Sequence, residues 1–239
     1  MTVLGLVLAG PLQAWGSASR FTNRGTDDAP TKSGVLGLLA AARGLRRTDP
    51  LEDLASLTFG VRIDQPGELL RDFQTARSLD GKDSMPLSHR YYRADARYVV
   101  GLEASQELLE GVAESLRNPT FPLYLGRRSC PPSEPIVPAI RDVGLAQFLH
   151  DEPWRASSWW RRRLRNDPIR VEYRIDADAW GPVLGEPAGE FTQRDEPISF
   201  DPEHRDYGWR RVRHGWVDLG GAEAPSTAPL VHDPLSFLE

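Results

Sequence analysis

The sequence predicts an α+β protein with a ferredoxin-like βαββαβ core, a protruding β-hairpin and a less regular C-terminal extension. Three observations predict this class. A continuous apolar run near the start leads into a helical pattern, β-rich runs flank a second helical pattern, and a long aperiodic stretch interrupts them. When one strand pair is treated as a hairpin with a long tip, the elements follow the order of this fold.

The first strand and the first helix have the clearest signals. Residues 3–9 are continuously apolar and end at Gly10-Pro11, which is typical of a buried strand that stops at a tight turn. Thr31 is suited to the N-cap of the helix that follows. The apolar positions of this helix recur at helical spacing, so we expect one face to pack on the sheet: Val35, Leu38, Leu39, Ala42 and Leu45.

Shorter patterns predict the remaining core elements. Residues 57–63 and 69–75 are β-rich and are expected to form the second and third strands, and residues 96–102 form the next one. Residues 105–116 predict an amphipathic helix, and residues 121–125 predict a short last strand.

The aperiodic stretch between these strands contains Gly81, Pro86 and many charges. We expect it to protrude as a thumb over about residues 76–93. These elements define a predicted ferredoxin-like domain over residues 1–130. Residues 131–239 are predicted to be an extension that packs on it.

Within this extension the patterns are weaker. Residues 154–165 are rich in tryptophan and arginine and are expected to contain a helix. Residues 168–175 alternate and predict a strand. Residues 218–239 have few periodic apolar positions and are expected to be a loose tail.

The composition excludes several classes. The single cysteine, Cys130, cannot form an internal disulfide or a cysteine-rich zinc site, so a cytoplasmic location is expected. No apolar run is long enough to span a bilayer, and the apolar start lacks a basic region typical of a signal peptide, so no membrane partner is expected.

The net charge of −5 argues mildly against nucleic-acid binding. Only two of the 29 basic residues are lysines, Lys32 and Lys82. A coding bias can cause this, but arginine also suits phosphates and bases.

Two N-terminal motifs are candidates for ligand binding. In Gly10–Gly16, Gln13 offers a donor and an acceptor and Trp15 offers a stacking face; the alternative is a turn closed by a core tryptophan. In the second motif, Arg20 and Arg24 precede a helix start at Thr31-Lys32-Ser33. A lysine in the first turn is disfavoured by the helix dipole unless an anion lies between them, so this start predicts a phosphate site. The alternative is an ordinary capped helix.

Basic and aromatic residues also gather later in the chain. The thumb carries Arg77 and the run His89-Arg90-Tyr91-Tyr92-Arg93, a composition suited to single-stranded nucleic acid or simply to a mobile surface hairpin. The loop 124–133 contains Arg127, Arg128 and Ser129, which could bind RNA or form a solvated basic turn. The stretches 159–165 and 205–213 could face RNA or an acidic protein partner.

Catalytic patterns are weak. The five histidines are scattered without zinc-ligand spacing, no nucleophile elbow is present, and no metal or cofactor is expected. The remaining chemistry is metal-independent RNA cleavage, in which His89 and Tyr91 or Tyr92 would move protons and Lys32 would stabilise charge.

Six segments in this order resemble the CasD family of CRISPR Cascade complexes. The first two are the most specific, and the matches run to about residue 217: Gly10–Gly16, Pro30–Ala41, His89–Ala96, Tyr124–Ser133, Arg194–Phe200 and Arg205–Arg211.

The resemblance implies an RNA-recognition-motif-like domain with a thumb and a non-catalytic role in the type I-E complex. Such a subunit holds the 5′ handle of the crRNA and caps the backbone filament. It contacts the CasC backbone subunit and the large CasA subunit, and meets target DNA only through the complex. A type I-C relative does cleave repeat RNA, so an endoribonuclease is the alternative. The expected RNA-binding residues are Gln13, Trp15, Arg20, Arg24, Thr31, Lys32, Ser33, Arg77, His89, Arg90, Tyr91, Arg127, Arg128 and Ser129.

Overall fold

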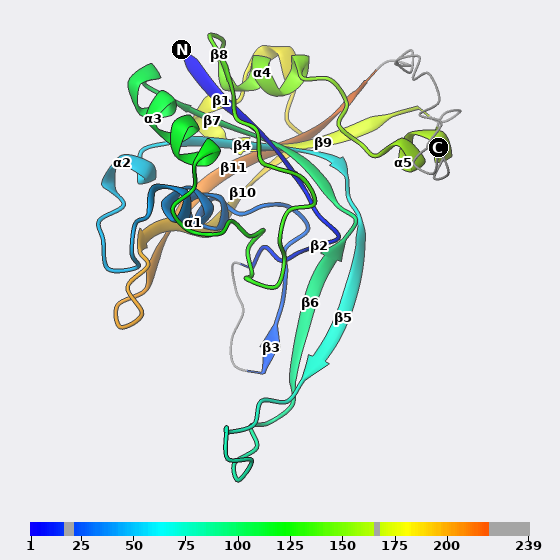
Figure 1. Ribbon diagram of the computed structural model, residues 1–239. Helices are drawn as coiled ribbons and strands as arrows, with labels where there is room; N and C mark the ends of the chain where they lie inside the picture. Colours follow the sequence, from blue (N-terminus) through cyan, green and yellow to red (C-terminus); the bar gives the residue numbers. More distant parts are fainter. Residues whose placement is uncertain (17–21, 165–167, 220–239) are drawn as a thin grey trace, which may run out of the picture.

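The computed structural model describes residues 1–16, 22–164 and 168–219, which form two antiparallel-rich sheets and five α-helices (Figure 1). The larger sheet has seven strands in the spatial order β10-β11-β9-β4-β7-β1-β8. These strands are β1 (Thr2–Ala9), β4 (Thr58–Gln65), β7 (Arg97–Ala104), β8 (Ala139–Arg141), β9 (Arg170–Asp176), β10 (Gly189–Ser199) and β11 (Asp206–Asp218).

Helices cover both faces of this sheet. On one face, α1 (Lys32–Arg43) and α3 (Gln106–Arg117) pack over the core that contains Leu4, Leu6 and Leu8 of β1. On the other face, α4 (Leu145–Asp151) covers a second core that contains Val3. The continuous apolar run of β1 therefore reflects burial on both faces. The remaining helical elements are short: α2 (Glu52–Ala55), α5 (Ser158–Arg163), η1 (Ala177–Ala179) and η2 (Pro182–Leu184).

A row of glycines lets α4 approach the sheet closely. Gly5, Gly101 and Gly60 lie side by side on β1, β7 and β4, because Gly101 is in register with both of the others. A Cβ atom at Gly101 would come within 2.5 Å of Leu145, one at Gly60 within 2.9 Å of Leu149, and one at Gly5 would overlap the Phe148 ring. All three contacts are with α4, so its position depends on this row.

The chain after residue 130 is more regular than the sequence predicts. The strand expected at 168–175 is β9, which pairs with β4, and β10 and β11 extend the same sheet outward. The larger sheet contains strands from both sides of the predicted division at residue 130. The helix expected within 154–165 is α5, and the predicted tail beyond residue 219 lies outside the described residues.

The predicted strand at 121–125 is wrong. The amides of Thr120 and Phe121 donate to the carbonyl oxygens of Ala42 and Ala41 at the end of α1 (2.9 and 3.2 Å). The start of this segment is therefore hydrogen-bonded to a helix and does not pair with a strand. The short strand β8 pairs with the outer side of β1. Among the strands of the larger sheet, those before residue 142 therefore lie in the spatial order β4-β7-β1-β8.

The second sheet contains the thumb. Strands β5 (Glu68–Gln74) and β6 (Ser88–Ala94) form a long hairpin that extends well away from the main sheet (Figure 1). Two short strands, β2 (Leu12–Gln13) and β3 (Asn23–Arg24), pair with β6. The predicted third strand thus belongs to the thumb, which begins earlier in the sequence than the expected residue 76.

A buried arginine connects α4 to β4. Arg62 is fully buried and forms two hydrogen bonds with Asp64 (2.6 and 2.9 Å). It also donates to the carbonyl oxygens of Leu149, Glu152 and Pro153 at 2.6–2.9 Å. This guanidinium therefore fixes the chain where it leaves α4.

We expect Arg62→Ala to lower the free energy of unfolding by about 3–5 kcal/mol, because it leaves the Asp64 carboxylate buried without its partner. Urea denaturation measures this change. Arg141→Ala, at an exposed site, is the control and should change stability by less than about 0.5 kcal/mol. The double variant Arg62→Met with Asp64→Leu should be more stable than Arg62→Ala; if it is not, the unpaired charge is not the cause.

Candidate nucleic-acid interface

One rim of the molecule brings together three loops that are distant in the sequence: 10–16, 25–31 and 124–130. The amide of Ala14 donates to the carbonyl oxygen of Leu125 (3.1 Å), and the amide of Asp27 donates to that of Trp15. Gly126 has a φ of +84°, and a Cβ atom there would overlap the Ala14 carbonyl. Only glycine permits this contact.

A pocket of about 230 Å³ lies where these loops meet, and we call it the loop pocket. Its chemically distinctive lining residues are Trp15, Thr31, Ser33, Arg47, Tyr124, Phe200, Arg205 and Tyr207. None of the described residues that line it is acidic. Arg47 and Arg205 are exposed and form no ion pair within the described part of the chain. The pocket therefore offers two free cations, hydroxyl groups and aromatic faces, which suit a phosphate and a base.

Gln13 and Trp15 form the wall behind this pocket. Both side chains are fully buried. The Gln13 amide nitrogen donates to the carbonyl oxygen of Ala96 (2.8 Å), and its oxygen accepts from the Trp15 indole (3.1 Å). The core tryptophan, the alternative considered from the sequence, is what the structure contains. Trp15 reaches the loop pocket at its base, whereas Gln13 holds the loop.

Lys32 does not lie free at the start of α1. Its ammonium group is buried 2.8 Å from Glu196 and 3.8 Å from Asp176, and its amide donates to Asp195 (2.8 Å). The first-turn anion site predicted from Lys32 is therefore wrong in its central feature, because carboxylates of this chain already balance the lysine. Thr31 caps the helix by accepting from the Gly34 amide (3.2 Å).

Arg127 joins the glycine-containing loop to the thumb. Its guanidinium donates to the carbonyl oxygens of Tyr91 (3.0 Å), Arg24 (2.7 Å) and Gly25 (3.0 Å), and it lies 4.9 Å from the centre of the Tyr92 ring. These bonds occupy much of its donor capacity. Arg128 and Ser129 are exposed beside it, whereas Cys130 is buried, and burial raises the pKa of its thiol.

The thumb has two chemically different faces. One face carries the cross-strand pairs Leu69–Arg93, Arg71–Tyr91 and Phe73–His89, and these positions include no carboxylate. The other carries the pairs Leu70–Tyr92 and Asp72–Arg90, with Arg24 next to Arg90 on β3. Three nitrogen atoms on β6 are buried without a hydrogen-bond partner in the described structure: His89 Nδ1, Arg90 Nε and Arg93 Nε.

The remaining predicted residues are spread out. Arg77 is exposed near the tip of the thumb, opposite Ser84. Arg20 lies outside the described residues. The loop before α1 is held by Arg174, which donates two hydrogen bonds to Asp28 (2.6 and 2.7 Å) and keeps the pKa of that carboxyl group below its usual value.

The groups expected for RNA cleavage do not form one cluster. His89 and Tyr91 share a face of β6, but Tyr92 is on the other face and buried, and Lys32 is paired with carboxylates. Over residues 1–16, 22–164 and 168–219, no three histidine, cysteine or acidic side chains group as metal ligands. None of the helices in that part of the chain has the length and apolar character needed to cross a bilayer.

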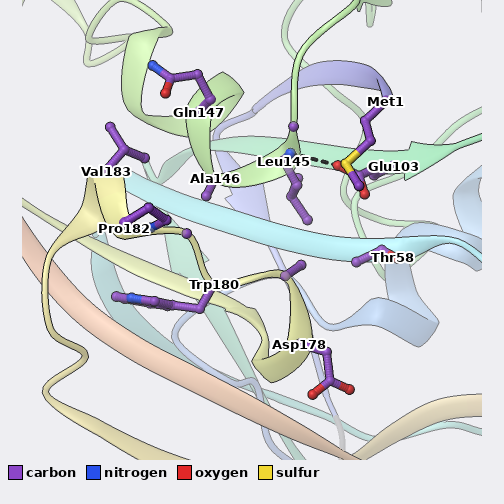
Figure 2. A pocket seen from close by; sticks show the side chains of 13 residues that line it. Met1, Thr58, Glu103, Leu145, Ala146, Gln147, Asp178, Trp180, Pro182 and Val183 are labelled. Atoms are coloured by element: carbon purple, nitrogen blue, oxygen red, sulfur yellow. Dashed lines mark hydrogen bonds between the residues drawn. The ribbon is translucent and has the colours of Figure 1, made fainter.

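A cavity of about 400 Å³ lies on the α4 side, beside η1 and η2 (Figure 2). Its lining is mostly apolar, with Trp180, Pro182 and Val183 on one side and α4 on the other. Glu103 accepts a hydrogen bond from the Leu145 amide (2.8 Å), as Figure 2 shows. The described lining has acidic but no basic side chains, so this cavity is unsuited to phosphates.

The sequence did not place four of the loop-pocket residues together in one pocket. Arg47 follows α1, Phe200 and Arg205 come from the turn between β10 and β11, and Tyr207 comes from the start of β11. The stretch 205–213 was expected to face RNA or an acidic partner, but its position beside the start of α1 could not be found from the sequence. The one available signal was the mixture of arginine and aromatic residues after position 205.

We expect Gly126→Ala to disturb this rim more than the same change at a positive-φ glycine elsewhere. Gly185 also has a positive φ (+68°) but has open space around its Cβ position, so Gly185→Ala should cost only the backbone strain, about 1–3 kcal/mol. Gly126→Ala should cost about 1–3 kcal/mol more, because the loop must move away from Ala14. Thermal and urea denaturation measure both; equal losses would show that the close contact is unimportant.

Comparison with known proteins identifies the family. Residues 3–213 match the family described as CRISPR-associated protein (Cas_Cas5). The CRISPR system Cascade subunit CasD of Escherichia coli (strain K12) is 31% identical over 214 residues, which are 81% of this chain and 87% of that protein. A solved structure described as "Crystal structure of Cas protein" superposes with a TM-score of 0.69 at 36% identity, covering 90% of this chain and 95% of the other. A chain of a "CRISPR RNA-guided surveillance complex" has a TM-score of 0.69 at 28% identity, covering 91% of each. This chain is therefore a member of the CasD/Cas5 family of CRISPR-associated proteins.

Proposed function

We propose that this chain is a non-catalytic subunit of a type I-E CRISPR Cascade complex that binds the 5′ handle of the crRNA and caps the backbone filament. The loop pocket is the observation that carries this proposal, because Arg47 and Arg205 lack carboxylate partners in the described structure and stand among aromatic side chains. Unpaired, splayed-out RNA is recognised by such groups.

The thumb supports the same role. Its carboxylate-free face offers Arg71, Arg93 and His89 alongside Tyr91 and Phe73, and nitrogens of β6 remain without partners. Buried polar groups are normally hydrogen-bonded, so these unpaired nitrogens mark β6 as an unusual element of the thumb. Arg127 fixes the thumb to the rim, and a strand bound in the loop pocket could continue onto it.

The wider assignments follow from membership of such a complex. We propose the CasC backbone subunit and the large CasA subunit as protein partners, target DNA as an indirect partner, and the cytoplasm as the location. The order β4-β7-β1-β8 with α1 and α3 supports a ferredoxin-like core, in which β8 takes the place of the last strand. We propose residues 1–130 as the RNA-binding part and the rest as the extension that faces partner subunits.

Arg205→Ala should weaken binding of handle RNA by about 1–3 kcal/mol and reduce the slope of affinity against salt by about 1, since one phosphate contact is lost. Arg47→Ala should behave similarly. Electrophoretic mobility shifts at several salt concentrations measure both. Arg117→Ala on α3, which does not line the loop pocket, is the control, and an equal loss in that variant would contradict a local site.

The purified chain should leave repeat RNA intact in the absence of a separate repeat-processing endoribonuclease. The reason is that Lys32, the group expected to stabilise charge in a metal-independent mechanism, is paired with carboxylates, and Tyr92, one of the two alternative tyrosines, is buried. Denaturing gels of labelled RNA test this for the wild type and for His89→Ala. Cleavage products from the wild type that disappear in His89→Ala would replace the proposal with an endoribonuclease.

A further inference from the structure

The short helix α5 presents a basic and aromatic surface outside the loop pocket. Its start is fixed firmly: Gln65 accepts hydrogen bonds from the amide (3.0 Å) and hydroxyl (2.8 Å) of Ser157, and it donates to the carbonyl oxygen of Asp95. Gln65 ends β4, and Asp95 lies between β6 and β7. The helix is therefore attached where the thumb joins the main sheet.

Two arginines of α5 have no charge partner. No acidic residue occurs between Pro153 and Leu164. Arg161 is used internally, because it donates to the carbonyl oxygens of Ala156 (2.9 Å) and Trp154. Arg162 and Arg163 are exposed and form no ion pair with any described residue, and the Arg163 guanidinium lies 5.6 Å from the centre of the Trp160 ring.

A tryptophan and a cavity lie beside these charges. Trp159 is 43% exposed. Its ring centre lies 5.4 Å from that of Trp160, and the two rings are nearly perpendicular. It lines a cavity of about 370 Å³ together with Arg97, Asp95 and the Gly10-Pro11 turn. Arg97 lies 3.6 Å from Glu134, and Asp95 is the one carboxylate among the described lining residues. A carboxylate there can accept from a base amino group.

This combination favours nucleic acid over an acidic protein. Arginines without ion pairs suit either partner. Trp159, which is exposed and lines a cavity, also provides a place for a flat base. Proteins that hold single strands combine cations along the backbone with aromatic side chains on which bases stack.

We infer that Trp159, Arg162 and Arg163, the α5 surface, form a second contact for single-stranded nucleic acid, separate from the loop pocket. A base enters beside Trp159, and neighbouring phosphates meet the two arginines. This goes beyond handle binding, because it requires no handle sequence and uses none of the residues of the loop pocket.

Fluorescence anisotropy with labelled oligo(U) and oligo(dT) tests this inference on the full chain. Trp159→Ala should weaken binding by about 5- to 100-fold, the range expected for one stacked base. Arg162→Ala with Arg163→Ala should weaken it and lower the salt dependence. A control double variant removes two exposed arginines elsewhere, Arg117→Ala on α3 with Arg141→Ala on β8, and should bind as the wild type does. Circular dichroism establishes that each variant folds.

Three outcomes would overturn the inference. The α5 variants could bind oligonucleotides like the wild type, or the control could lose as much affinity as the α5 double variant, which would indicate bulk charge alone. In the third outcome, oligonucleotide binding is unchanged but co-purification with partner subunits is lost, which would make α5 a protein-docking helix. Handle RNA tested with Arg205→Ala in parallel reports on the proposed function independently, so failure of either proposal can be told from failure of the other.

Discussion

A buried charge network centred on Lys32 and Arg210 fixes the position of the hairpin that lines the loop pocket. Lys32 contacts Glu196 and Asp176, while Arg210 donates to Asp195 (2.6 Å) and Asp176 (2.8 Å). The network joins the start of α1 to the outer hairpin of β10 and β11. Because that hairpin is held against α1, it supplies Phe200, Arg205 and Tyr207 to the loop pocket. A buried lysine paired with carboxylates thus helps to assemble the surface proposed to bind RNA.

The thumb illustrates how a projecting hairpin can still be well positioned. An isolated hairpin is marginally stable in water. Here β2 and β3 pair with β6, and Arg127 bonds to carbonyl oxygens on both β3 and β6. The base of the thumb therefore moves with the rim of the pocket, whereas its tip extends with exposed apolar residues such as Leu79 and Met85.

The sequence was informative where a local pattern decides the structure. The apolar run of β1, the capped helix after Thr31 and the thumb could all be predicted, because their signals lie within a few neighbouring residues. The strand expected at 121–125 was wrong because hydrogen bonds to α1, invisible in the local pattern, compete for that segment. Gln13 and Lys32 were expected to face a ligand for a similar reason. Their side chains are bound by Ala96 and Glu196, which lie far along the chain, so neither the motif around Gln13 nor the position of Lys32 in the first turn could show these partners.

The glycine row beneath α4 acts as a notch cut across three strands. A helix can pack this closely on the sheet only at the level of the three glycines, because the residues next to them in the strands carry side chains. The glycine row therefore sets the position from which the chain leaves α4, and Arg62 on β4 then holds that chain through its carbonyl oxygens. The position of α5 on the surface therefore depends on three glycines, which lie under α4 on the face of the sheet opposite α1.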